Sequence, residues 1–188
     1  NKAGIDVRLN TTATPQMIKS NNFDTVLVAV GAEPVISKMR GADADNVFNI
    51  LTAYNNKKAL GKNVVMIGAG RIGTETALGM AKDGHKVTIL CSGKELIELE
   101  FIGSHNMMNQ IAILQNHPDL DFVLEVTVKD ITGGKVTYTD SKGETKSIQT
   151  DSIVIYAGLK PRMDEAEKFI GSADQVLLLG DCTGKNGT

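Results

Sequence analysis

The sequence has little proline, little cysteine and no long apolar run. Four prolines against 19 glycines indicate tight turns between regular elements rather than linkers or disordered segments. The two cysteines, Cys91 and Cys182, lie far apart without a CxxC pair, so we expect free thiols in a reducing cytoplasm. No apolar run approaches the roughly 20 residues that span a bilayer, so we expect no membrane partner.

A surplus of one charge is also absent. Lys and Arg total 20 and Asp and Glu total 22, which gives a net charge of −2 and argues against a nucleic-acid partner. Apolar residues make up 41% of the 188 residues, enough for one packed domain or one domain with part of another. The first residues include no apolar signal-peptide segment and no initiator methionine, so we expect a processed or excised chain.

The hydrophobic periodicity predicts alternating strands and helices. Glycine-containing turns at 133–134 and 140–143 separate three of the strands and predict a β-meander. We expect strands over 3–11, 23–30, 62–67, 86–90, 122–131, 135–139, 145–149, 152–157 and 175–179, helices over 15–20, 49–60, 71–83, 104–116 and 163–170, and a loop over 32–46.

Residues 68–73 match the pattern G-x-G-x-x-G. The pattern is specific here because it follows a predicted strand directly and opens a predicted helix. Gly68 permits the tight turn, Gly70 lets a pyrophosphate approach the backbone, and Gly73 lets the helix pack closely on the sheet. The positive end of that helix would meet the phosphate charge. We therefore predict dinucleotide binding, most simply of NAD(P)H, in an α/β Rossmann-type fold.

The residues that would choose between NAD and NADP do not decide the matter. An Asp or Glu about 20 residues after the glycines would bind the NAD ribose, and an Arg would suit NADP. The sequence has Cys91 and Ser92 at this position, followed by Lys94 and Glu95. Ser92 and Lys94 could hold a phosphate and Glu95 a ribose, so both cofactors stay open.

Four motifs, in order, resemble the two-dinucleotide flavoprotein reductases, the pyridine nucleotide–disulfide oxidoreductase superfamily and its relatives. The glycine segment 67–77 looks like their NAD(P)H-binding motif. Segments 30–34 and 157–161 look like the Gly-x-x-Pro stretches on either side of that domain, although Val30 replaces the usual threonine. Segment 179–182 looks like their Gly-Asp motif. Segment 45–64 and the Gly-Asp tail are most similar to the 2-enoate reductase and 2,4-dienoyl-CoA reductase group.

The resemblance implies a three-layer FAD/NAD(P)-binding fold, with a parallel sheet and a β-meander crossover, and two cofactor sites. By this reading Glu75 faces the nicotinamide and flavin, Gly158 lines the nicotinamide pocket, and Asp181 holds FAD. Alternatively, Glu75 complements the helix dipole, Gly158 ends a strand, and Asp181 is a surface residue. We expect no metal site, and these cofactor-binding residues: Gly31, Gly68, Ala69, Gly70, Arg71, Ile72, Gly73, Glu75, Cys91, Ser92, Gly158 and Asp181.

Two departures from the family pattern limit the expected function. The chain has no earlier G-x-G-x-x-G for FAD and no redox cysteine pair. The first departure suggests an NAD(P)H-binding domain at 47–162 between flanking strips of an FAD domain, 1–46 and 163–188. The second argues against disulfide-reductase chemistry.

The sequence thus predicts one part of a flavin-dependent oxidoreductase. It would position the nicotinamide for hydride transfer to FAD, and other domains would use the electrons for an enoate or enoyl-CoA reduction. The chain would be inactive alone. The alternative is a non-catalytic Rossmann domain that senses a nucleotide or has a structural role. An FAD-binding glycine motif upstream would distinguish the two.

Overall fold

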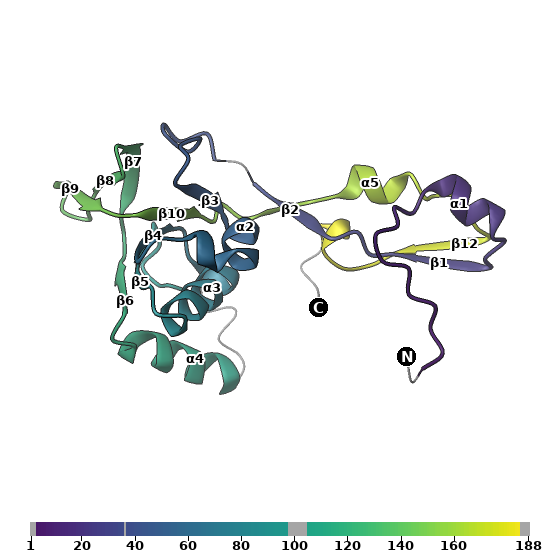
Figure 1. Cartoon of the computed structure of the whole chain (residues 1–188), viewed down its shortest axis with the longest axis horizontal. Helices are drawn as coiled ribbons and strands as arrows, with labels where there is room; N and C mark the ends of the chain where they lie inside the picture. The colour runs from purple at the N-terminus through teal and green to yellow at the C-terminus, as the bar shows by residue number, and fades with distance from the viewer. Residues whose placement is uncertain (1–2, 36, 98–104, 185–188) are drawn as a thin grey trace. The chain divides into compact units, whose positions relative to one another are not determined.

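The computed structural model describes residues 3–35, 37–97 and 105–184, which form two compact units (Figure 1). Unit 1 comprises Asn1–Glu33 and Leu159–Thr188, and unit 2 comprises Pro34–Gly158. The boundaries between these units lie at 33/34 and 158/159. The sequence-based division into domains places them at 46/47 and 162/163. Among the described helices, none is both long enough and apolar enough to cross a membrane.

Unit 2 is built on a five-stranded parallel sheet. Its strand order is β3 (Val47–Asn49), β10 (Ser152–Ile155), β4 (Asn63–Ile67), β5 (Lys86–Leu90) and β6 (Leu120–Val123). From β4 the chain builds outward through β5 and β6, then returns to place β10 on the other side of β4. The strand order therefore reverses between β4 and β10, and ligands of such sheets bind beyond the carboxyl ends of the strands at this switch point.

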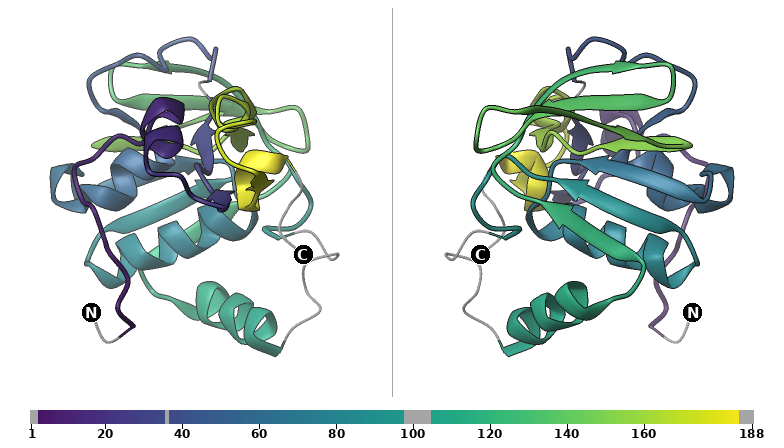
Figure 2. Two further views of the ribbon diagram at one scale, coloured as in Figure 1. Left: turned by 90° about the vertical axis from the view of Figure 1, so that its right-hand side faces the viewer. Right: turned by 90° about the vertical axis from the view of Figure 1, so that its left-hand side faces the viewer.

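Different layers cover the two faces of this sheet (Figure 2). Val64 and Met66 of β4 pack in one core with the helices, while Val65 and Ile67 pack in a second core with the meander. Because both faces are covered, β4 and β10 read as nearly continuous apolar runs. The helical layer contains α2 (Ile50–Asn55), the short 3₁₀ turn η1 (Lys57–Ala59), α3 (Gly70–Lys82) and α4 (His105–Asn116), and the meander contains β7 (Thr127–Thr132), β8 (Lys135–Thr139) and β9 (Thr145–Gln149).

Helix α3 buries an apolar side that includes Ala77, Met80 and Ala81 against the sheet. Two buried threonines share this side, and their hydroxyls donate to carbonyls one turn earlier. Thr74 Oγ1 lies 2.8 Å from the Gly70 oxygen, and Thr76 Oγ1 lies 2.7 Å from the Ile72 oxygen. The buried hydroxyls are therefore satisfied within the helix, and the side stays dry.

Unit 1 contains two parallel strands, β1 (Thr25–Val28) and β12 (Gln175–Leu178), with α1 (Pro15–Ser20), α5 (Met163–Glu167) and the 3₁₀ turn η3 (Gly180–Thr183). One face packs in a small core that includes Val28, Phe169 and Cys182. On the other side Leu27, Leu177 and Leu179 are 62%, 46% and 56% exposed. Where the chain passes between the units, β2 (Ala32–Pro34) pairs with β11 (Leu159–Pro161).

The fold class expected from the sequence is confirmed, but several element predictions are wrong. Residues 3–11 form no strand, because Gly4 and Asn10 adopt positive φ angles of 66° and 53° that interrupt an extended backbone. The predicted strand 122–131 is two strands in different sheets, β6 and β7. Glu125, at φ 55°, turns the chain between them.

Smaller corrections concern element ends. The predicted loop 32–46 begins with β2, and the predicted helix 49–60 is a cap at Asn49, then α2 and η1. Asn49 ends β3, and its side-chain oxygen accepts the Thr52 N–H at 2.9 Å, so it begins the helix as an N-cap. The predicted helix 163–170 ends at Glu167. For the predicted helix 104–116, position 104 lies outside the described residues.

Candidate functional site

The glycine loop leaves β4 at the switch point and begins α3. Gly68 has a φ of 97°, and a Cβ there would collide with the carbonyl oxygen of Tyr156. Both the backbone angle and the close approach of β10 therefore require glycine at this position. At Gly73, a Cβ would lie 3.3 Å from Tyr156 Cδ1 and 3.4 Å from the Gly68 oxygen, so this glycine allows the helix to lie close to the sheet.

Gly70 lies on the open side of the loop. A Cβ built there would have one heavy atom within 4 Å, Tyr156 Cε1 at 3.8 Å. The Gly70 N–H donates to the Leu96 carbonyl at 2.8 Å, so the segment after β5 supports the loop from one side. The N-cap residue of α3 is Ala69, and no side chain of the described residues caps the helix. The N–H groups of Arg71 and Ile72 lie in the first turn, where no carbonyl of the helix can accept them, so they are available to an anion.

Arg71 and Glu75 lie one turn apart on the exposed side of α3. Arg71 Nε and Glu75 Oε1 are 3.5 Å apart, with side chains 65% and 45% exposed. Such an exposed pair contributes little stability, so Arg71 can exchange its partner for a phosphate at low cost. Because α3 begins at Gly70, Glu75 lies in its second turn, and the first turn holds no acidic residue.

At the end of β5, Cys91 and Ser92 face different surroundings. Cys91 is buried in the helix-side core, and its thiol donates to the Glu95 carbonyl at 3.5 Å. Ser92, Lys94 and Glu95 are exposed. A ribose at this strand end would therefore meet Ser92 and the residues after it rather than the Cys91 thiol.

The remaining predicted residues flank the passages between the units. Gly158 follows β10 at φ 93°, and its carbonyl accepts the Val35 N–H at 3.0 Å. Gly31 follows β1 at φ 72°, and its carbonyl accepts the Arg162 N–H at 3.2 Å. Asp181 is exposed in η3. The glycine loop, Cys91, Ser92 and Gly158 belong to unit 2, whereas Gly31 and Asp181 belong to unit 1.

Two residues of the loop environment were missed in the sequence, Tyr156 and Leu96. Tyr156 is half-buried beneath the glycine loop, and this burial raises the pKa of its phenol. Tyr156 lies beside Gly68 because β10 pairs with β4, and these two strands are more than 80 residues apart in the sequence. No local motif carries that information.

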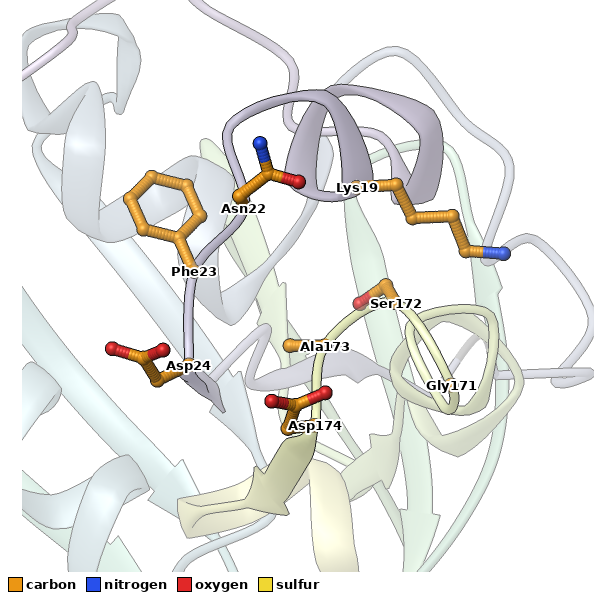
Figure 3. Close-up of a pocket in the computed structure, with 8 residues that line it drawn as sticks. All are labelled: Lys19, Asn22, Phe23, Asp24, Gly171, Ser172, Ala173 and Asp174. Atoms are coloured by element: carbon orange, nitrogen blue, oxygen red, sulfur yellow. The ribbon is translucent and has the colours of Figure 1, made fainter.

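A hollow of about 440 Å³ lies in unit 1 (Figure 3). Its lining includes Asp24 and Asp174, at the amino-terminal ends of β1 and β12. Gly31 and Asp181 follow the carboxyl ends of the same strands, so the hollow is no part of the predicted cofactor site. Among the described residues, no three His, Cys, Asp or Glu side chains gather into a possible metal site.

Curated relatives match almost the whole chain. Bilirubin reductase of Mediterraneibacter gnavus is 28% identical over 178 residues, covering 95% of this chain and 27% of that enzyme. NADH oxidase of Thermoanaerobacter brockii is 30% identical over 186 residues, covering 96% and 28%. Cinnamate reductase of Clostridium sporogenes is 27% identical over 181 residues, covering 95% and 26%. The chain thus spans about a quarter of the length of these relatives.

Solved structures agree with this similarity. The 2-naphthoyl-CoA reductase complex superposes with a TM-score of 0.84 at 30% identity, covering 97% of this chain and 27% of that chain. Thioredoxin reductase of T. acidophilum, at a TM-score of 0.65 and 21% identity, covers 86% and 58% and shares the fold. The resemblance to flavoprotein reductases, with the enoate reductase group among them, is confirmed.

The sequence profile of one family, described as pyridine nucleotide-disulphide oxidoreductase, matches residues 1–183. This family uses FAD and NAD(P)H as cofactors. The parallel sheet, the glycine loop at its switch point and the uncapped helix fit a dinucleotide of this kind. The chain belongs to the pyridine nucleotide-disulphide oxidoreductase family.

Proposed function

We propose that this chain is the NAD(P)H-binding portion of a flavin-dependent oxidoreductase and positions the nicotinamide for hydride transfer to FAD. The observation that carries the proposal is the glycine loop at the switch point, open at Gly70 and followed by a helix without a side-chain cap. When bound, the two cofactors supply the redox chemistry, while the protein supplies binding and orientation.

In this proposal each part of the loop has a distinct role. The N–H groups of Arg71 and Ile72 hold the pyrophosphate, and the Arg71 guanidinium leaves Glu75 to pair with it. Ala69 and Gly70 form the wall along which the phosphates lie, and Ser92 contacts the ribose. Gly158 and Glu75 lie toward the nicotinamide, as the family resemblance implies.

Residues 1–46 and 163–188 are proposed to be strips of an FAD domain, with Gly31 and Asp181 at the FAD site. The support is the small, partly uncovered β1–β12 sheet of unit 1. This sheet has two strands, and Leu27, Leu177 and Leu179 are exposed beside them. Further strands and helices of a longer protein would cover this apolar surface, and the relatives are three to four times longer than the match.

The electrons are proposed to pass from FAD to a domain that reduces an enoate or an enoyl thioester. The names of two similar proteins support this choice, because cinnamate is an unsaturated carboxylate, 2-naphthoyl-CoA is a thioester, and both proteins are reductases. By this proposal the chain alone turns over no substrate. Steady NADH oxidation by the pure chain, without an added flavoprotein, would contradict it.

Calorimetric titration of the chain with NADH, NADPH and FAD tests the cofactor assignment. We expect one equivalent of NADH or NADPH to bind, and the preferred one identifies the cofactor that Ser92 and Lys94 select. The proposal is wrong if neither binds at millimolar concentration. Stoichiometric binding of FAD alone would mean that the glycine loop serves the other cofactor.

A matched pair of glycine variants connects binding to the loop. Gly70→Ala places a methyl group on the open side, where the phosphates approach. Gly84→Ala creates a similar positive-φ strain at the end of α3, where nothing lies within 4 Å. We expect G70A to weaken NAD(P)H binding at least about tenfold more than G84A, a difference of about 1.4 kcal/mol. Equal effects would place the cofactor elsewhere.

A further inference from the structure

Tyr156 lies beside the glycine loop on the other side of the switch point. It follows β10, whose last residue Ile155 is in register with Ile67 of β4. The Tyr156 N–H donates to the Ile67 carbonyl at 2.8 Å. Tyr156 and Gly68 therefore leave the carboxyl edge of the sheet side by side, at the place where a bound dinucleotide crosses it.

The direction of the tyrosine ring follows from two distances. Cδ1 lies 3.3 Å from the position of a Cβ on Gly73, and Cε1 lies 3.8 Å from that of a Cβ on Gly70. One edge of the ring thus runs from the first turn of α3 toward the loop. Because the hydroxyl is attached next to Cε1, it lies at the Gly70 end, toward the open side of the loop.

The hydroxyl is a hydrogen-bond donor that the described residues leave unused. Other hydroxyls near α3, those of Thr74 and Thr76, donate to backbone carbonyls, whereas Tyr156 forms no side-chain hydrogen bond with any described residue. Burial raises the pKa of its phenol and keeps the proton in place. The Tyr156 oxygen is not among the buried side-chain atoms that lack a partner, so water reaches the hydroxyl and a bound ligand can replace that water.

We propose that the Tyr156 hydroxyl donates a hydrogen bond to the pyrophosphate of the dinucleotide bound at the glycine loop. This inference rests on the proposed function and adds a residue that no glycine motif contains. The ring limits the depth of the site behind Gly70, and the hydroxyl supplies a neutral donor in addition to the N–H groups of Arg71 and Ile72. A bond from a phenol to a phosphate anion is stronger than one between neutral groups.

Tyr156→Phe removes the oxygen and keeps the ring against Gly70 and Gly73, so the fold should persist. Calorimetry should show that Y156F binds NADH and ADP-ribose about tenfold more weakly than the wild-type chain. Both ligands contain the pyrophosphate, so both should lose affinity equally. Tyr54→Phe, on the exposed side of α2, and Tyr138→Phe, in the meander core, are controls that should leave binding unchanged.

Three outcomes separate the inference from the proposed function. A wild-type chain that binds no NADH contradicts the proposed function. A chain that binds NADH equally with and without the hydroxyl contradicts the inference alone. Loss of NADH affinity with ADP-ribose affinity intact would overturn the inference too, because the hydroxyl would then contact the nicotinamide.

A second measurement needs no variant and decides the matter if Y156F fails to fold. In a chain labelled with ¹³C at tyrosine Cζ, the pH titration of each phenol is followed by NMR with and without NADH, which is stable in base. A hydrogen bond donated to phosphate raises the pKa of Tyr156 further on binding, since the neutral phenol is favoured. An unchanged Tyr156 titration would overturn the inference.

Discussion

Single backbone contacts at the glycine loop determine how closely the helix, the sheet and β10 approach. Gly68 adopts a positive φ and faces the Tyr156 carbonyl, so two independent constraints act on one residue. Gly84 has a similar φ without a neighbour within 4 Å. The pair therefore separates the cost of backbone strain from the cost of a collision.

Gly84→Ala should lower the free energy of unfolding by about 1–2 kcal/mol, the cost of a left-handed residue with a Cβ. Gly68→Ala should lower it by more than about 3 kcal/mol, because β10 must also move away. Urea denaturation of both variants measures the difference. Equal losses would mean that β10 is not packed against the loop as described.

The phenol of Tyr156 should make stability depend on pH in the alkaline range. Its pKa in the folded chain is raised above the ordinary value of 10.0 by burial. The free energy of unfolding is therefore unaffected by this group below about pH 10. It falls as the pH rises toward the pKa of the folded chain, since the phenol of the unfolded chain ionises first. Urea midpoints from pH 8 to 11 should fall more for wild type than for Y156F. Parallel curves would refute the burial of this group.

At the level of elements, local signals predicted the β4–α3–β5 unit to within a few residues. Glycines 68, 70, 73 and 84 mark both ends of α3, and the apolar periods of the neighbouring segments are long and regular. The predicted strand 122–131 failed because the turn at Glu125 carries no glycine or proline signal. The position of Tyr156 could not be predicted, since it depends on pairing between strands far apart in the sequence.

The turn between β8 and β9 is organised by one carboxylate. Asp140 Oδ1 accepts the N–H groups of Lys142 and Glu144 at 2.9 and 3.0 Å, and the Lys146 ammonium lies 2.6 Å from Oδ2. The bond from Lys146, with the two N–H groups, holds the pKa of Asp140 below its ordinary value of 3.8. The resulting stability is present above about pH 4 and is lost as pH falls through the lowered pKa.

Asp140→Asn should therefore lower the melting temperature at pH 7, with a gap to wild type that narrows below pH 4 and closes in stronger acid. Thermal unfolding followed by circular dichroism from pH 2 to 7 measures this gap. Asp43→Asn, an exposed carboxylate outside the meander, is the matched control and should change little. A gap that is constant with pH would show that the charge of Asp140 is unimportant.

At the level of the whole molecule, the two units differ in how well each is packed. Unit 2 has a five-stranded sheet covered on both faces, whereas the β1–β12 sheet of unit 1 has two strands, with three leucines exposed beside them. Local stability follows the number of buried apolar contacts and protected hydrogen bonds. We expect amides of β1 and β12 to exchange with solvent at least about tenfold faster than those of β4 and β10.

Hydrogen exchange followed by mass spectrometry tests this difference. Equal protection of both sheets would show that unit 1 is complete without further segments, and would weaken its assignment as a strip of an FAD domain. In a longer protein that contains the remaining FAD domain, protection of β1 and β12 should rise toward that of unit 2.

The central claim, that the glycine loop of this chain binds a reduced pyridine nucleotide, is tested most directly by backbone amide NMR during titration with NADH or NADPH. The account predicts that the largest shifts occur at residues 68–73 and at Tyr156, with smaller shifts at Ser92. Shifts confined to Gly31 and Asp181 in unit 1, or no saturable shift at millimolar nucleotide, would contradict it.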